Sequence, residues 1–204
     1  MKRRVIVDML KRDKRDKRII EVKQDEDLTY LLVGFGEGEK NVTVKVNGRG
    51  ASVQILGIIL AKEGTITIHT FQIHQQPDTT SDLLIKSVLF GDAKLNYDGL
   101  IKIEKDAQRS NAYQRNENLL LSDKAYVETK PELEILANDV RCTHGATIGR
   151  MDEEELFYIM SRGVDRKEAE RLVIEGFLVG VLERVGDKVI RDKIMKQIQK
   201  RLSI

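Results

Sequence analysis

The chain has 204 residues, of which 41% are hydrophobic and 33% charged, with a formal net charge of +2 and two prolines. This composition predicts a folded protein with one substantial domain and an appendage. No apolar run approaches the ~20 residues that span a bilayer. Five tyrosines, five phenylalanines and no tryptophan give little capacity for base stacking. We therefore expect neither a membrane nor a nucleic-acid partner.

The first residues and the cysteine content indicate a compartment. The apolar run at 5–7 is followed at once by Asp8, so it is too short for the hydrophobic region of a secretory signal. A single cysteine excludes an internal disulfide framework and is compatible with a reducing environment. We expect a cytoplasmic protein.

Residues 1–40 contain short apolar runs on either side of a charged segment. The runs at 5–10 and 19–22 predict a hairpin, and residues 28–36 predict a third strand. Aspartates interrupt the basic residues of 11–18, which is typical of a solvated turn or a strand edge.

From residue 41 to about 147 the pattern is that of many short strands. Alternating apolar residues recur around 42–46, 51–55, 66–68, 84–90 and 95–99, with glycine-containing turn signals between them. Such spacing predicts an all-β sandwich, barrel or solenoid, and periodicity leaves the three open. We place the β core at 1–149, with 1–40 as its N-terminal strands.

A helical segment is predicted over 150–204. Acidic residues at 152–155 favour a first helix turn, and Gly163 fits its C-terminal cap. Asp165 and Glu168 resemble a capping box for a second helix. A third helix is predicted over 187–202. The apolar stripes of the second and third helices are Ala169, Leu172, Val173, Gly176, Phe177, Gly180 and Val181, and then Ile190, Ile194, Ile198 and Leu202.

The segment 141–149 holds the only cysteine, Cys142, and one of three histidines, His144. On a strand these two side chains project from the same face, where thiolate and imidazole could reach one metal. From the residues alone, a buried apolar cysteine and a turn histidine are the simpler interpretation. His69 and His74, five residues apart, point to opposite faces of a strand, so we expect a structural role for His74 rather than a joint metal site.

Motifs around this pair resemble a known family. They are Arg115-Asn116 with Leu119-Leu120-Leu121-Ser122, Pro131-Glu132-Leu133-Glu134-Ile135, Cys142-Thr143-His144-Gly145-Ala146-Thr147, and Phe157-Tyr158 with Ser161-Arg162-Gly163. In this order and spacing they closely resemble the C-terminal core of the SufB/SufD family, scaffold subunits of the SUF iron–sulfur cluster assembly machine. The resemblance is closer to SufD than to SufB and covers about residues 74–183. The large N-terminal region typical of the family is almost entirely missing from the sequence.

The resemblance implies a right-handed β-helix (solenoid) core with a small C-terminal helical appendage. It implies that Cys142 and His144 take part in holding a transient iron–sulfur cluster between chains, the second chain being another copy or a SufB-like subunit. It also implies that the C-terminal helices contact a SufC-like ABC ATPase, for which our candidate residues are Glu175, Phe177 and Leu178. Asn116 stands about where SufB has a sulfur-accepting cysteine, so a dedicated cysteine for sulfur is missing at that position.

The sequence thus predicts a scaffold subunit that is not itself an enzyme. One alternative is a structural adaptor with the same fold and no cluster binding. A less favoured alternative is a hydrolase with Cys142 as nucleophile and His144 as base, for which no third residue orients the imidazole.

Overall fold

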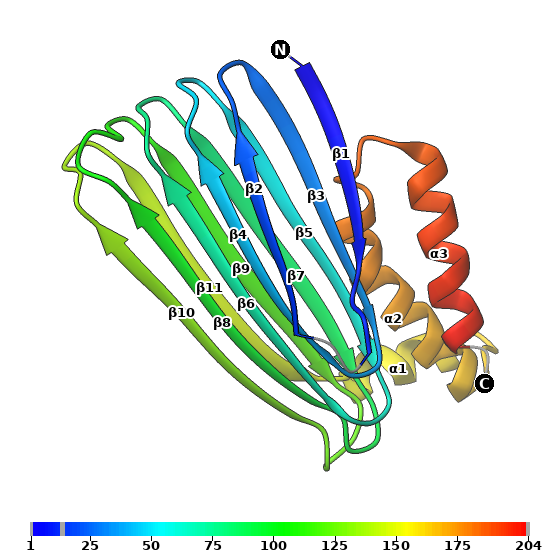
Figure 1. Cartoon of the computed structure of the whole chain (residues 1–204). Helices are drawn as coiled ribbons and strands as arrows, with labels where there is room; N and C mark the ends of the chain where they lie inside the picture. Colours follow the sequence, from blue (N-terminus) through cyan, green and yellow to red (C-terminus); the bar gives the residue numbers. More distant parts are fainter. Residues whose placement is uncertain (1, 13–14, 203–204) are drawn as a thin grey trace.

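The structure, a computed structural model that describes residues 2–12 and 15–202, is a parallel β-solenoid with helices on one side (Figure 1). Asp13 and Lys14 of the predicted charged segment lie outside the described residues. Odd-numbered strands form sheet A, ordered β1-β3-β5-β7-β9-β11, and even-numbered strands form sheet B, ordered β10-β8-β6-β4-β2. The prediction of a mainly β solenoid with C-terminal helices is confirmed.

The strands are eight to ten residues long and each pairs in parallel with the strand two positions away in the chain. Their bounds are β1 (Lys2–Met9), β2 (Arg15–Val22), β3 (Glu26–Phe35), β4 (Gly38–Val46), β5 (Ser52–Ala61), β6 (Thr65–His74), β7 (Thr80–Leu89), β8 (Lys94–Ile103), β9 (Asn111–Leu120), β10 (Tyr126–Ile135) and β11 (Arg141–Arg150). Alternate side chains point into the coil, so Val42, Val44 and Val46 are buried while their neighbours are half-buried. Stacked coils thereby enclose one continuous interior.

The predicted N-terminal hairpin is wrong. β1 and β2 belong to different sheets, and each pairs in parallel, β1 with β3 and β2 with β4. The two runs are successive sides of one coil, so residues 1–40 contribute solenoid strands. An alternating apolar run does not reveal which strand it pairs with. The charged segment between the runs is equally compatible with a hairpin loop and with a turn between two sheets.

Three helices follow the last strand: α1 (Glu153–Met160), α2 (Arg166–Leu182) and α3 (Lys188–Leu202). The predicted caps at Asp165 and Gly163 are confirmed, because Asp165 accepts from the Glu168 amide and Gly163 has φ +89°. Asp152, predicted in the first turn of α1, is instead its N-cap and accepts from the Glu154 amide. None of the helices in the described part of the chain is long and apolar enough to span a membrane.

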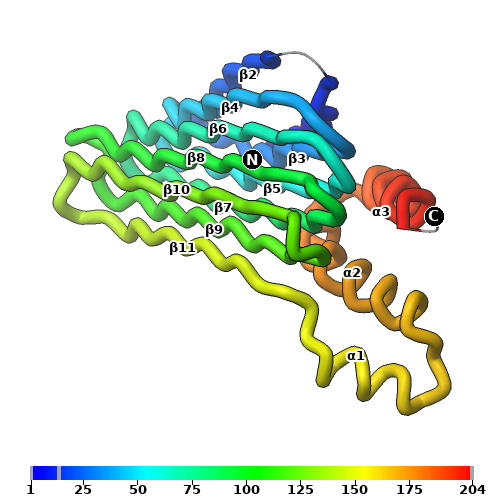
Figure 2. The backbone as a smooth tube through the Cα atoms, turned by 90° about the horizontal axis from the view of Figure 1, so that it is seen from below, coloured from blue at the N-terminus to red at the C-terminus, as the bar shows by residue number. Residues whose placement is uncertain are grey.

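α2 and α3 lie against the outer face of sheet A (Figures 1 and 2). Ile174 and Leu178 of α2 and Ile194 and Ile198 of α3 pack with apolar side chains of β3, β5 and β7. Burying each such side chain contributes about 1.5–3 kcal/mol, so the two helices are part of the folded core. Sheet B keeps its outer face uncovered by these helices (Figure 2).

The predicted buried stripe of α2 is only partly right. Ala169 and Val181 are buried as expected, but the helix turns Ile174, Leu178 and Leu182 toward the sheet. Leu172 is exposed. The third-helix stripe is confirmed, with Ile194 and Ile198 buried and Ile190 and Leu202 partly buried against the same cluster.

Candidate functional site: the open end of the solenoid

The N-terminal end of the solenoid is closed by a buried ion cluster. Lys40 Nζ, with a side chain 1% exposed, lies 2.7 Å from Asp8 Oδ2 and 2.8 Å from Asp16 Oδ2. Tyr30 donates to the same Asp8 oxygen at 2.9 Å. The lysine hydrogen bond lowers the pKa of Asp16. Each buried charge therefore has a partner, which lets a polar cluster cap the apolar interior.

Three of the four terminal strands carry features that discourage pairing with another chain. β1 and β2 are rich in basic and acidic residues. β10 contains Pro131 and three glutamates at 128, 132 and 134. Charges and proline are the usual protection of a sheet edge.

β11 lacks this protection. From Cys142 to Gly149 it carries no charged residue apart from the titratable His144, and nearly all of the strand is exposed. Within the described residues it pairs with β9 alone, so its other edge is open (Figure 2). A long, uncharged, exposed edge strand is a template for strand pairing. The C-terminal end is thus the open end of the solenoid.

Cys142 and His144 lie on the same face of this edge strand, as predicted, and that face is the inward one. Their register partners on β9 are Ala112 and Gln114, which are buried in the interior. Cys142 is half-buried and packs against a small apolar cluster that includes Ile101 and Ala112, and burial raises the pKa of its thiol. His144 is exposed. In the described chain, no hydrogen bond joins the pair. The raised thiol pKa and the absent bond both work against the hydrolase alternative.

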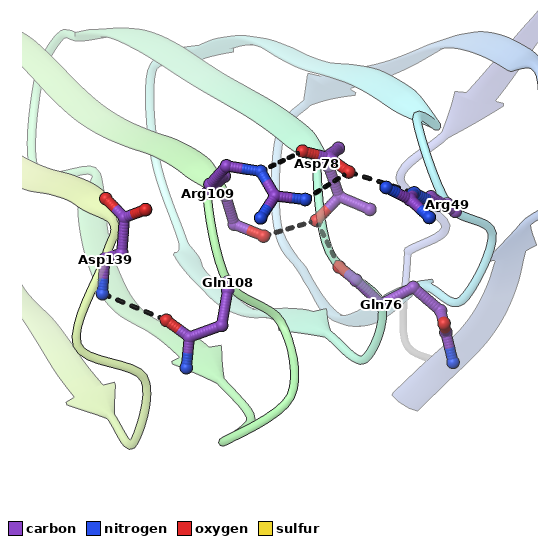
Figure 3. Close-up of polar contacts among 8 residues, drawn as sticks. Arg49, Gln76, Asp78, Gln108, Arg109 and Asp139 are labelled. Atoms are coloured by element: carbon purple, nitrogen blue, oxygen red, sulfur yellow. Dashed lines mark hydrogen bonds and ion pairs between the residues drawn. The ribbon is translucent and has the colours of Figure 1, made fainter.

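The turn before Cys142 is held by a stack of turn residues (Figure 3). Asp78, at φ +61°, accepts from Arg49 at 3.0 Å and from Arg109 at 2.6 Å. One coil further on, the Asp139 amide donates to Gln108 Oε1 at 3.0 Å, and the Arg109 amide donates to the Asp139 carbonyl. Contacts linking four successive turns of the solenoid therefore position the start of β11.

The interior becomes polar toward the open end. Gln72 donates to Gln114 Oε1 at 3.1 Å, and Gln114 donates to the Gly99 carbonyl at 3.1 Å. Asn118 donates to Asn116 Oδ1 at 2.7 Å. Asn116 is therefore a buried member of an amide ladder. Sequence alternation marks these amides as inward, but it does not reveal their partners.

One chain supplies too few donors for a cluster at this site. Among the described residues, no group of three or more His, Cys, Asp or Glu could hold a metal ion. Cys142 and His144 give one thiolate and one imidazole, a donor set that suits iron. A second edge with the same pair would bring the number to four, the usual complement of an iron–sulfur site.

The open end is joined directly to the helical appendage. β11 ends at Arg150 and α1 begins at Glu153. α1 extends away from the sheets and packs mainly on α2 (Figure 2). It exposes 74% of Phe157 and 61% of Tyr158, and a groove of about 400 Å³ between α1 and α2 contains Leu172. Sequence reasoning used Phe157 and Tyr158 as a family motif but missed them as surface residues.

The three ATPase-contact candidates have different surroundings. Leu178 is fully buried in the chain's own core, so here it presents no surface to a partner. Glu175 accepts from Gln199 at 3.2 Å. Phe177 lines the α1–α2 groove, with Lys86 Nζ 4.4 Å from its ring centroid. Of the three candidates, Phe177 is the one that lines the α1–α2 groove.

The other histidines lie as predicted, on opposite faces of β6. His69 is on the outer face, with Nδ1 3.0 Å from Asp98 Oδ2. His74 is fully buried, and its ring nitrogens hydrogen-bond with Thr79 and Ser81. Burial lowers the pKa of His74 to about 4, so the ring is neutral at physiological pH.

Fold and site together define a solenoid subunit whose open end carries a thiol and an imidazole on an edge strand. A family model described as the SufBD core domain of SUF-system FeS cluster assembly matches residues 15–177. The chain belongs to this SufBD family of iron–sulfur cluster assembly proteins.

Curated relatives agree with this membership. The chain is 31% identical over 173 residues to the iron–sulfur cluster assembly protein SufD of Escherichia coli (strain K12), covering 84% of the chain and 41% of that protein. It is 32% identical over 184 residues to the chloroplastic protein ABCI7 of Arabidopsis thaliana, covering 87% and 39%. SufD of Bacillus subtilis (strain 168) is 32% identical over 176 residues, covering 86% and 34%. The chain thus spans about two fifths or less of the length of these relatives.

Proposed function

We propose that the chain is a scaffold subunit of a SUF-type assembly complex in the cytoplasm, where it presents a cluster-building site without turnover chemistry of its own. The observation that carries this proposal is the placement of Cys142 and His144 on the inward face of β11, the one terminal strand without edge protection. The iron–sulfur cluster is the cargo of this site. A structural adaptor without cargo remains the alternative.

In this proposal the open end pairs with a second copy of the chain or with a SufB-like subunit. Strand addition to β11 satisfies its free backbone groups and covers the exposed end of the interior. It also places the partner's ligands opposite Cys142 and His144. Because the thiol pKa is raised by burial, the thiol stays protonated until iron binds and displaces the proton.

Anaerobic reconstitution with iron and sulfide tests the site. We expect Cys142→Ala and His144→Ala each to abolish most of the visible charge-transfer absorption, because each removes one ligand type from every chain. Thr143→Ala, on the opposite face of the same strand, is the matched control and should behave as the wild type. Equal absorption from all four proteins would favour the structural adaptor.

We further propose that a SufC-like ABC ATPase docks on α1 and the α1–α2 groove. Support comes from Phe157 and Tyr158, two large exposed side chains on a helix covalently continuous with β11. A displacement of α1 by the ATPase would reach the strand that carries Cys142 and His144 through the two intervening residues, 151–152. The nucleotide cycle would in this way act on the cluster site.

Co-purification with the ATPase of the same genome tests this contact. We expect Phe157→Ser combined with Tyr158→Ser to weaken binding by about 2–4 kcal/mol, since aromatic anchors dominate most interfaces. Val189→Ser, which changes an equally exposed side chain on α3, is the control. Point variants are preferable to removing residues 165–204, because α2 and α3 are part of the core. Undiminished binding by the double variant would place the contact elsewhere.

A further inference from the structure

A second concave surface lies far along sheet A from the open end. A groove of about 790 Å³ runs over the outer face of β1, β3 and β5, next to the α2–α3 connection. Its floor contains Thr29, Ser52 and Gln54, and its wall contains Arg184 and residues 186–189. Two positions further along the strands, Leu31 and Leu56 are already buried beneath the helices. The groove therefore begins where the helical cover of the sheet ends.

Two cations in the lining of the groove, Arg3 and Lys188, are not held in a close ion pair. The lining has four cations, but Arg4 is paired with Glu26 at 3.0 Å and Arg184 with Asp82 at 2.9 Å, so Arg3 and Lys188 are the two that face the lining carboxylates Asp27 and Asp187. Asp187 is engaged as the cap of α3, accepting from the Ile190 amide at 3.1 Å. Lys188 forms no ion pair with any other described residue. Arg3 is 88% exposed and 3.6 Å from Asp27, a loose contact. Two cations are thus available to a ligand.

The wall of the groove is fixed before any ligand arrives. Arg184 Nη1 donates to Asp82 Oδ2 at 2.9 Å, which ties the α2–α3 connection to β7. Val185 is fully buried in the helix–sheet core, and its carbonyl accepts from Arg191 at 2.7 Å. A preorganised wall lowers the loss of conformational entropy on ligand binding.

The floor supplies hydrogen-bond donors. The side chains of Thr29, Ser52 and Gln54 make no hydrogen bond within the described part of the chain, and Thr29 and Gln54 are register partners on adjacent strands. A polar floor alone is what solvent exposure favours on any uncovered sheet. Here it lies in a concave site with free cations at the rim, which is the donor arrangement that phosphate oxygens require.

We propose that this groove binds a phosphate-bearing small molecule, with Arg3 and Lys188 contacting phosphate oxygens and the floor side chains donating to the rest. The volume exceeds what a single phosphate fills and falls in the range of small-molecule sites. The shared chemistry is a polyphosphate group, which a free pyrophosphate or a nucleotide could provide. This site is independent of the cluster-assembly proposal.

Calorimetric titration with inorganic pyrophosphate tests the site on the full chain. We expect saturable binding by the wild type and at least about tenfold weaker binding when Arg3→Gln is combined with Lys188→Gln, because both charge-assisted contacts are lost. Lys94→Gln with Lys124→Gln removes the same charge from two exposed lysines elsewhere and is the control. A parallel titration with AMP distinguishes a nucleotide ligand from free pyrophosphate. A site for nucleotides should also bind AMP, whereas a site for pyrophosphate alone should not.

Two outcomes would overturn the proposal. One is the absence of saturable heat up to about 5 mM pyrophosphate, a weaker affinity than a built site gives. The other is equal weakening by the groove pair and the control pair, which would show non-specific attraction by net charge. Nuclear magnetic resonance shifts of the Thr29 and Ser52 amides on titration would locate the bound pyrophosphate at the floor.

Discussion

Replacing Lys40 with methionine is expected to lower the free energy of unfolding by about 3–5 kcal/mol, as breaking a buried ion cluster from one side does. Methionine fills most of the space of the lysine stem but leaves Asp8 and Asp16 without their shared cation. Asp8 is itself 8% exposed, so its carboxylate cannot recover that loss in water. The first coil, which closes the apolar interior, would then be the first part to open.

Urea denaturation of wild type and variants measures this loss. Lys45→Met is the matched control, because Lys45 lies on the same strand and faces outward, and surface substitutions usually change stability by about 0.5 kcal/mol or less. Adding Asp8→Asn to Lys40→Met should return part of the loss, since it removes one uncompensated buried charge. If Lys40→Met and Lys45→Met unfold alike, the cluster does not stabilise the N-terminal coil.

Lys40 also illustrates what sequence could have revealed. It stands two residues before Val42 in a clean alternation, so the pattern that places the valines inside also places this lysine inside. A charged residue at an inward position requires partners. Of those partners, Asp8 belongs to the first run of the predicted hairpin and Asp16 to the charged segment that follows it. Local pattern found the inward position, but only the coil topology brings its partners together.

The same distinction between local pattern and whole-fold topology explains which other features were predictable from the sequence. Features set within a few residues, such as the cap at Asp165 and the shared face of Cys142 and His144, were predictable because spacing alone determines them. The buried face of α2 was not, because Gly176 and Gly180 were counted as apolar although the larger Ile174 and Leu178 make the contact. The open end depends on which strand is last in each sheet, and that is a property of the whole fold.

His74 is expected to make the protein sensitive to acid between about pH 6.5 and 4. Its pKa falls from 6.5 to about 4 on folding, because burial disfavours the charged ring. The unfolded chain therefore binds more protons in this range, and the free energy of unfolding decreases as the pH is lowered. The shift corresponds to about 3 kcal/mol, fully present above pH 6.5 and lost by about pH 4.

The measurement compares unfolding free energies at pH 7 and pH 4.5 for wild type, His74→Gln and His69→Gln. Carboxylates titrate in all three proteins, so the difference between each variant and the wild type isolates the histidine. His74→Gln should be less stable than the wild type at pH 7, where it loses the hydrogen bonds to Thr79 and Ser81, and should approach or exceed it at pH 4.5. His69, on the outer face of the same strand, should show no such crossover. A parallel pH dependence for His74→Gln and wild type would mean that the acid response arises elsewhere.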